Sequence, residues 1–89
     1  TYSIDNPQVT VTDAGNYVVL FERYKKYNYQ GVYAIVVDAK GNVAQKATKV
    51  SATAYLNPCR MPVYSNGKVW WTGNKTKGKD TYLFSYAVK

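Results

Sequence analysis

The chain has 89 residues, enough for one small domain, and its 46% hydrophobic content is ordinary for a globular protein and argues against disorder. Twelve Lys and Arg residues against five Asp and Glu give a formal net charge of +7, which favours an acidic partner such as a nucleic acid, an anionic polymer or a cell surface. The single cysteine, Cys59, excludes an internal disulfide framework, and the lack of histidine and of metal-ligand spacing predicts no metal and no cofactor. No run of about 18 apolar residues occurs, so no membrane span is predicted.

Alternation of apolar and polar residues predicts strands along the whole chain, and no segment has a convincing helical period. The ten tyrosines favour the same interpretation, because tyrosine is enriched in strands. In chain order, the predicted strands cover residues 2–4, 9–12, 17–24, 31–38, 48–55, 62–64, 68–72 and 81–88.

Glycine-containing turns separate the predicted strands. Asn66-Gly67 is the strongest hairpin signal, because both residue types readily take the positive φ that a type I′ turn needs. Residues 13–16 (DAGN) and 38–42 (DAKGN) predict two further turns. Short strands joined by such turns are typical of an all-β domain with antiparallel sheets.

Two stretches of the chain share one pattern at an offset of 51 residues. Residues 18–38 and 69–89 each contain an apolar strand, a basic polar loop and a second apolar strand. A period of this length is expected of propeller blades and other repeats. We predict one domain over residues 1–89, with a first repeat over about 9–56 and a second over about 60–89. Residues 1–5 would be available to complete the edge of the last sheet, in the same chain or in a neighbour.

Residues 15–22 (GNYVVLFE) and 31–42 (GVYAIVVDAKGN) resemble a motif of β-propeller-like repeats in large secreted or surface proteins of bacteria, and residues 62–71 and 83–86 are similar to the following blade. The resemblance implies two propeller-blade-like repeats and an extracellular or cell-surface location. A closed propeller needs about four to eight blades, and this chain supplies about two. Closure in a homo-oligomer, strand exchange, a place in a larger chain, and a compact small β-sandwich or barrel all remain open.

Two basic loops at equivalent places in the repeats are the first candidate binding site. Charge interleaved with aromatic rings is what a single-stranded nucleic acid or a sugar polymer needs. The alternative is a pair of solvated hairpin loops. The candidate ligand-binding cations are Arg23, Lys25, Lys26, Lys75, Lys77 and Lys79, and the interleaved rings are Tyr24, Tyr27 and Tyr29.

Trp70 and Trp71 form the second candidate ligand-binding site. Neighbouring strand residues face opposite sides of a sheet, so we expect one ring in the core and the other on a sheet surface, where it would be a platform for a sugar. Tyr33 and Tyr86 would extend that surface. The alternative is that packed sheets bury both tryptophans. Asn74 begins an Asn-Lys-Thr glycosylation sequon, which is compatible with secretion.

No catalytic residue is predicted. No histidine is present to activate Cys59 or a serine, and Asp13 and Asp38 belong to turns. We therefore expect a non-enzymatic extracellular binding module that recognises a glycan or an anionic surface, as a homo-oligomer or as part of a larger chain. The alternatives are a fibre or surface-assembly subunit held by strand exchange and a small basic β-barrel that binds nucleic acid.

Overall fold

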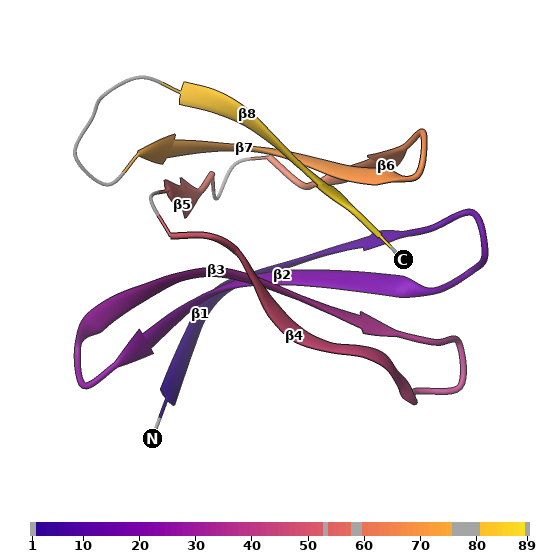
Figure 1. Cartoon of the computed structure of the whole chain (residues 1–89), viewed down its shortest axis with the longest axis horizontal. Coiled ribbons are helices and arrows are strands. Elements are labelled where there is room, and N and C mark those ends of the chain that lie inside the picture. The colour runs from indigo at the N-terminus through magenta and orange to yellow at the C-terminus, as the bar shows by residue number, and fades with distance from the viewer. Residues whose placement is uncertain (1, 53, 58–59, 76–80, 89) are drawn as a thin grey trace.

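The computed structural model describes residues 2–52, 54–57, 60–75 and 81–88 (Figure 1). Within these ranges all regular structure is β, in two antiparallel sheets, so the predicted all-β class is confirmed. None of the described residues belongs to a helix long and apolar enough to cross a membrane.

The first four strands form one sheet, which we call sheet A. Its strands β1 (Tyr2–Val11), β2 (Tyr17–Lys25), β3 (Asn28–Val37) and β4 (Val43–Ser51) pair in chain order as an up-and-down meander. β1 is one strand rather than the two predicted, because a bulge between Asp5 and Gln8 accommodates Pro7 without ending the pairing. This bulge is tolerated because β1 lies at the edge of its sheet.

The remaining strands form sheet B. β7 (Lys68–Lys75) lies at its centre and pairs with β8 (Thr81–Ala87) along one edge. The other edge of β7 is shared by two short strands, β5 (Ala54–Leu56) and β6 (Val63–Ser65). The edge strand of sheet B is therefore split, whereas its counterpart β1 is continuous (Figure 1).

Tight turns close the hairpins. Asn66 and Gly67 have φ values of 53° and 74°, as a type I′ turn requires, so the predicted hairpin is confirmed. Lys26 and Tyr27 also take positive φ, at 48° and 71°, and join β2 directly to β3. The longer basic loop predicted between residues 24 and 31 is therefore wrong, because β2 and β3 continue to a two-residue turn.

The two sheets pack face to face and bury a single apolar core between them. In β2 the alternating residues Val18 and Leu20 are fully buried, while Val19 between them faces the opposite side of sheet A. The buried core residues are Val18, Leu20, Val32, Ala34 and Val36 from sheet A and Leu56, Val69 and Trp71 from sheet B.

The strand register follows the 51-residue offset in one described pair but not in the hairpins, because Val19 lies opposite Ile35 whereas Trp70 lies opposite Ser85 and not Tyr86. Asp5 lies opposite Glu22 in sheet A, and at the same offset Leu56 lies opposite Gly73 in sheet B. Within this chain, however, β1 runs along β2 from Tyr2 onward, so residues 2–5 extend the first sheet and not the last, which corrects that part of the prediction. A propeller-like arrangement of the sheets stays a prediction.

Candidate functional site

The side of sheet A that faces away from sheet B, here called the outer face, combines apolar residues with cations. The described acids lie elsewhere: Asp13 and Asp38 are in turns, and Asp5 and Glu22 occupy the opposite parity of β1 and β2. The register places on the outer face Tyr2, Ile4, Pro7 and Val9 from β1, Val19, Phe21, Arg23 and Lys25 from β2, Tyr33 and Ile35 from β3, and Ala47 and Lys49 from β4.

Five of these side chains alternate as cation and ring across all four strands, in the order Lys25, Tyr2, Arg23, Tyr33 and Lys49; we call them the cation–aromatic ladder. The Arg23 guanidinium carbon lies 4.0 Å from the centre of the Tyr2 ring and 3.9 Å from that of Tyr33. Lys25 Nζ lies 5.7 Å from the Tyr2 ring, and Lys49 Nζ lies 5.8 Å from the Tyr33 ring. Each contact is within the range of an attractive cation–π interaction.

The strand register assembles the ladder. Tyr2 is directly opposite Lys25 in the β1–β2 pair, and Tyr33 is opposite Lys49 in the β3–β4 pair. Arg23 is opposite Gly31, where φ is 128° and the register of β2 and β3 shifts. A Cβ at Gly31 would collide with the backbone carbonyl of the neighbouring β4, so a glycine is needed for β4 to pack closely there.

Arg23 keeps spare hydrogen-bonding capacity. Its Nη2 donates to Tyr33 Oη at 2.7 Å, which uses one of the five N–H donors that a guanidinium carries. Its Nε is buried and has no hydrogen-bond partner among the described residues. The two rings hold the guanidinium plane in place and shield it partly from water, which strengthens its interaction with an incoming anion.

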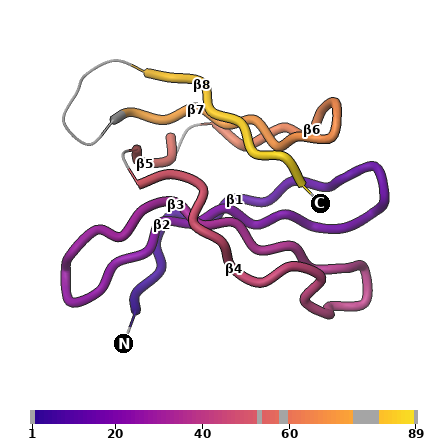
Figure 2. The backbone as a smooth tube through the Cα atoms, in the orientation of Figure 1, coloured from indigo at the N-terminus to yellow at the C-terminus, as the bar shows by residue number. Residues whose placement is uncertain are grey.

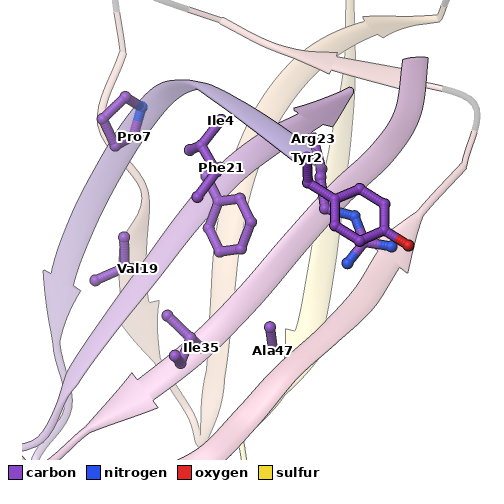
Figure 3. Close-up of a pocket in the computed structure, with 8 residues that line it drawn as sticks. All are labelled: Tyr2, Ile4, Pro7, Val19, Phe21, Arg23, Ile35 and Ala47. Carbon is purple, nitrogen blue, oxygen red and sulfur yellow. The ribbon is translucent and has the colours of Figure 1, made fainter. Parts of the chain in front are cut away.

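An apolar groove lies next to the ladder on the outer face (Figure 3). Its volume is about 520 Å³. Figure 3 shows Arg23 and Tyr2 together at one end, with Val19 and Ile35 away from them. The described residues that line the groove are Tyr2, Ile4, Pro7, Val19, Phe21, Arg23, Ile35 and Ala47.

The described residues of the first basic loop are divided between the two faces of sheet A. Arg23 and Lys25 lie on β2 and belong to the ladder, while Tyr24, between them, faces the opposite side. Tyr24 and Tyr29 pack with their ring centres 5.2 Å apart, and Tyr29 donates its hydroxyl proton to the Ala54 carbonyl. The prediction that these rings interleave with the cations is therefore wrong, because alternation along β2 separates them.

In Figure 2 the β2–β3 hairpin, the end of β7 and the start of β8 all lie on the left-hand side of the view. Lys26 and Tyr27 form the turn, and Tyr27 is 99% exposed. Lys75 is the last residue of β7. Lys77 and Lys79 lie outside the described residues.

The adjacent tryptophans point to opposite sides, as the alternation predicts. Trp71 is 2% exposed and stacks on Phe84 in the core, with the ring centres 5.8 Å apart. Trp70 is half-buried on the surface of sheet B, and its Nε1 donates to the Ser65 carbonyl at 3.1 Å. One ring is therefore partly accessible to a ligand.

Tyr33 and Tyr86 do not extend the Trp70 surface, contrary to the prediction. Tyr33 belongs to the ladder on sheet A. Tyr86 packs against the core, and its hydroxyl accepts a hydrogen bond from Gln45 Nε2. Asn74, the sequon residue, lies exposed on β7, where its Oδ1 accepts a hydrogen bond from Thr81 Oγ1 at 3.1 Å.

A second polar cluster joins the two sheets and was not predicted. Glu22 is 5% exposed, and its Oε2 accepts a hydrogen bond from the Leu56 backbone N–H at 2.8 Å. In the β1 bulge, Asn6 takes a φ of 55° and its Nδ2 donates to the Leu56 carbonyl at 3.2 Å. Gln8 Nε2 donates to the Asn57 carbonyl at 2.7 Å. These contacts hold the backbone of sheet B, so the cluster has a structural role.

Sequence reasoning identified Arg23 and Lys25 but missed the ladder partners Tyr2, Tyr33 and Lys49. The alternation in β1 and β2 was a usable signal for Tyr2, whereas the bulged pairing of β3 with β4 hides Lys49. The described residues include no group of three or more His, Cys, Asp or Glu side chains placed to hold a metal ion. Comparison with known proteins gave no matching family model and no significant similarity to a curated protein or to a solved structure.

Proposed function

We propose that this chain is a non-enzymatic binding module that holds an anionic ligand against the outer face of sheet A, at the cell surface or outside the cell. The observation that carries the proposal is the position of Arg23, 4.0 Å and 3.9 Å from the rings of Tyr2 and Tyr33. A guanidinium fixed in this way retains donors for two oxygens of a carboxylate or sulfate, which is the bidentate geometry in which arginine binds anions best.

The charge distribution supports the same proposal. Lys25 and Lys49 lie at the two ends of the ladder, and the register puts no described acid on this face. Positive charge that is not neutralised by neighbouring carboxylates attracts anions and raises their association rate. Because Arg23 is already fixed by its ring contacts, little side-chain entropy is lost when the ligand binds.

The mode of recognition differs from the one expected for the basic loops. An anionic glycan would meet an arginine plane and two tyrosine rings on a sheet face rather than flexible lysines in hairpins. Trp70 favours a second candidate function, the stacking of a sugar on sheet B. It is half-buried and has Lys68 Nζ 5.7 Å from its ring, so a stacked sugar acid would contact both groups.

The test measures the binding of alginate, a carboxylated polysaccharide, with neutral dextran as the ligand control, by calorimetry at low ionic strength. Arg23→Gln should weaken alginate binding roughly tenfold to a hundredfold, because hydrogen bonds to a charged group contribute about 1.5–3 kcal/mol each. The matched variant Lys40→Gln removes the same charge from the exposed β3–β4 turn and should change affinity by less than about threefold.

Equal losses in Arg23→Gln and Lys40→Gln would refute the proposal, because the attraction would then come from net charge alone. A loss confined to Trp70→Ala, with Arg23→Gln binding normally, would transfer the function to sheet B. The melting temperature of each variant is recorded alongside, so that a fold defect is recognised as such.

A further inference from the structure

The groove beside the ladder has a chemistry of its own, which a polyanion does not use. Its described lining is aliphatic or aromatic except for Arg23. Of the lining residues, Ile4 is 62% exposed and Tyr2 is 51% exposed. Contiguous apolar surface of this kind on a soluble protein marks a site for an apolar partner. The occupant of the groove should therefore carry a hydrocarbon portion.

Electrostatics restrict the occupant further. A second copy of the chain placed on this face would bring Arg23, Lys25 and Lys49 against their own counterparts, and the whole chain carries a net charge of +7. Like charges that are brought together without partners oppose association. The charge of the site is complemented by a ligand with a negative group, and Arg23 is the only charge among the described residues that line the groove.

These observations define an amphiphile with one anionic group and an aliphatic chain. We infer that the outer face of sheet A binds a single long-chain carboxylate, with its carboxylate at Arg23 and its chain in the apolar groove. This inference rests on the proposed function and names the ligand class of the same site. In Figure 3 the chain would start at the Arg23 end of the groove, cross the Phe21 ring and end near Val19 and Ile35.

The first experiment is a chain-length series of butanoate, octanoate and dodecanoate, measured by calorimetry below their critical micelle concentrations. A methylene transferred fully from water is expected to improve affinity about fourfold, and a groove that is open on one side should give about twofold per methylene. Dodecanol, which has the chain without the charge, should bind at least about tenfold more weakly than dodecanoate, because it forms no charge-assisted bond with Arg23.

The second experiment uses variants that separate chain from charge. Ala47→Phe places a ring in the groove and should weaken dodecanoate binding at least about tenfold, while alginate binding stays within about threefold. Ala39→Phe adds the same ring in the exposed β3–β4 turn and should change neither ligand. Arg23→Gln should weaken both ligands.

The outcomes distinguish the two proposals. If butanoate and dodecanoate bind equally well, or if Ala47→Phe leaves dodecanoate binding unchanged, the long-chain inference is wrong and the anion-binding function stands. If neither alginate nor any carboxylate binds, both proposals fail. Dodecanoate binding that appears only above its micelle concentration, or only with anionic phospholipid vesicles, would overturn the single-ligand site in favour of a lipid surface.

Discussion

Replacement of Glu22 by alanine tests how the two sheets are held together. Glu22 is 5% exposed and extends from β2 to the Leu56 N–H of β5, from which it accepts a hydrogen bond at 2.8 Å. Its carboxylate also lies 3.4 Å from Asn6 Nδ2 and from Tyr24 Oη. Glu22→Ala therefore removes one short and two long hydrogen bonds, and the short one is the bond that the Glu22 carboxylate accepts from the buried Leu56 N–H.

The size of the effect follows from these contacts. A hydrogen bond to a charged group contributes about 1.5–3 kcal/mol, and a buried N–H left without an acceptor costs about 1–3 kcal/mol. Both figures include the loss of the Leu56 N–H bond, so they cannot simply be added. We therefore expect Glu22→Ala to lower the free energy of unfolding by about 3 kcal/mol. Glu22→Gln keeps the shape and one acceptor oxygen and should lose about 1 kcal/mol. A domain of 89 residues has roughly 4–13 kcal/mol of stability, so the alanine variant should be severely weakened.

Equilibrium unfolding in urea, followed by tryptophan fluorescence, measures both losses, because Trp71 lies in the core between the sheets. With a urea dependence of about 1 kcal/mol per molar, the midpoint should fall by about 3 M for Glu22→Ala and about 1 M for Glu22→Gln. Asp13→Ala, at an exposed turn position, should shift it by less than about 0.5 M. Glu22→Ala and Asp13→Ala with the same midpoint would refute the role assigned to Glu22.

Three further predictions concern single residues. Gly31→Ala should cost at least about 2 kcal/mol, because its Cβ would meet the β4 backbone. Gly15→Ala, where φ is also positive but the space around the Cβ is open, should cost about 1 kcal/mol; equal unfolding free energies for the two variants would contradict this. Burial, and to a smaller extent the negative charge of Glu22, raises the pKa of Tyr29. The contribution of the neutral Tyr29 side chain to folding stability is therefore fully present below about pH 10 and is lost as the pH rises further. The stability difference between wild type and Tyr29→Phe should therefore narrow above pH 10 in urea unfolding, and a constant difference would argue against it. The hydrogen bond from the backbone N–H of Asn42 lowers the pKa of Asp38, so the contribution of the Asp38 carboxylate to folding stability is present at neutral pH and is lost below about pH 4. An NMR titration of the Asp38 carboxyl group should give a pKa below the ordinary value, and an ordinary value would be inconsistent with the turn geometry.

Local chemistry was sufficient to predict most of the fold. The Asn66-Gly67 turn and the strand alternation around Val18 and Leu20 need no tertiary information, and both are found as expected. The hairpin between β2 and β3 was predicted with a longer loop, because neither Lys26 nor Tyr27 is a residue type that signals positive φ, which is imposed there by the pairing of β2 with β3. Pro7 suggested a break in β1, but the edge position and the bulge made the break unnecessary.

The site was predicted only in part, for a different reason. Positive charge identified Arg23 and Lys25, but they were assigned to a loop together with Tyr24. Because β2 extends to Lys25, its side chains alternate between the two faces of sheet A up to that residue. This alternation places Tyr24 on the face opposite to Arg23 and Lys25. Tyr33 and Lys49 become ladder members only through the register shifts of β3, which depend on how β4 packs past Gly31. Those shifts are a tertiary property and leave no local pattern in the sequence.

The meander of sheet A has a kinetic consequence. Every strand pair in this sheet joins neighbours in the chain, so its hairpins require only short loop closures. Sheet B must also wait for β5 to reach Glu22, 34 residues earlier in the sequence. We expect sheet A to form first and sheet B to dock afterwards, with the Leu56 amide as the reporter of docking. Its hydrogen exchange would measure sub-global opening of the two sheets, separately from complete unfolding.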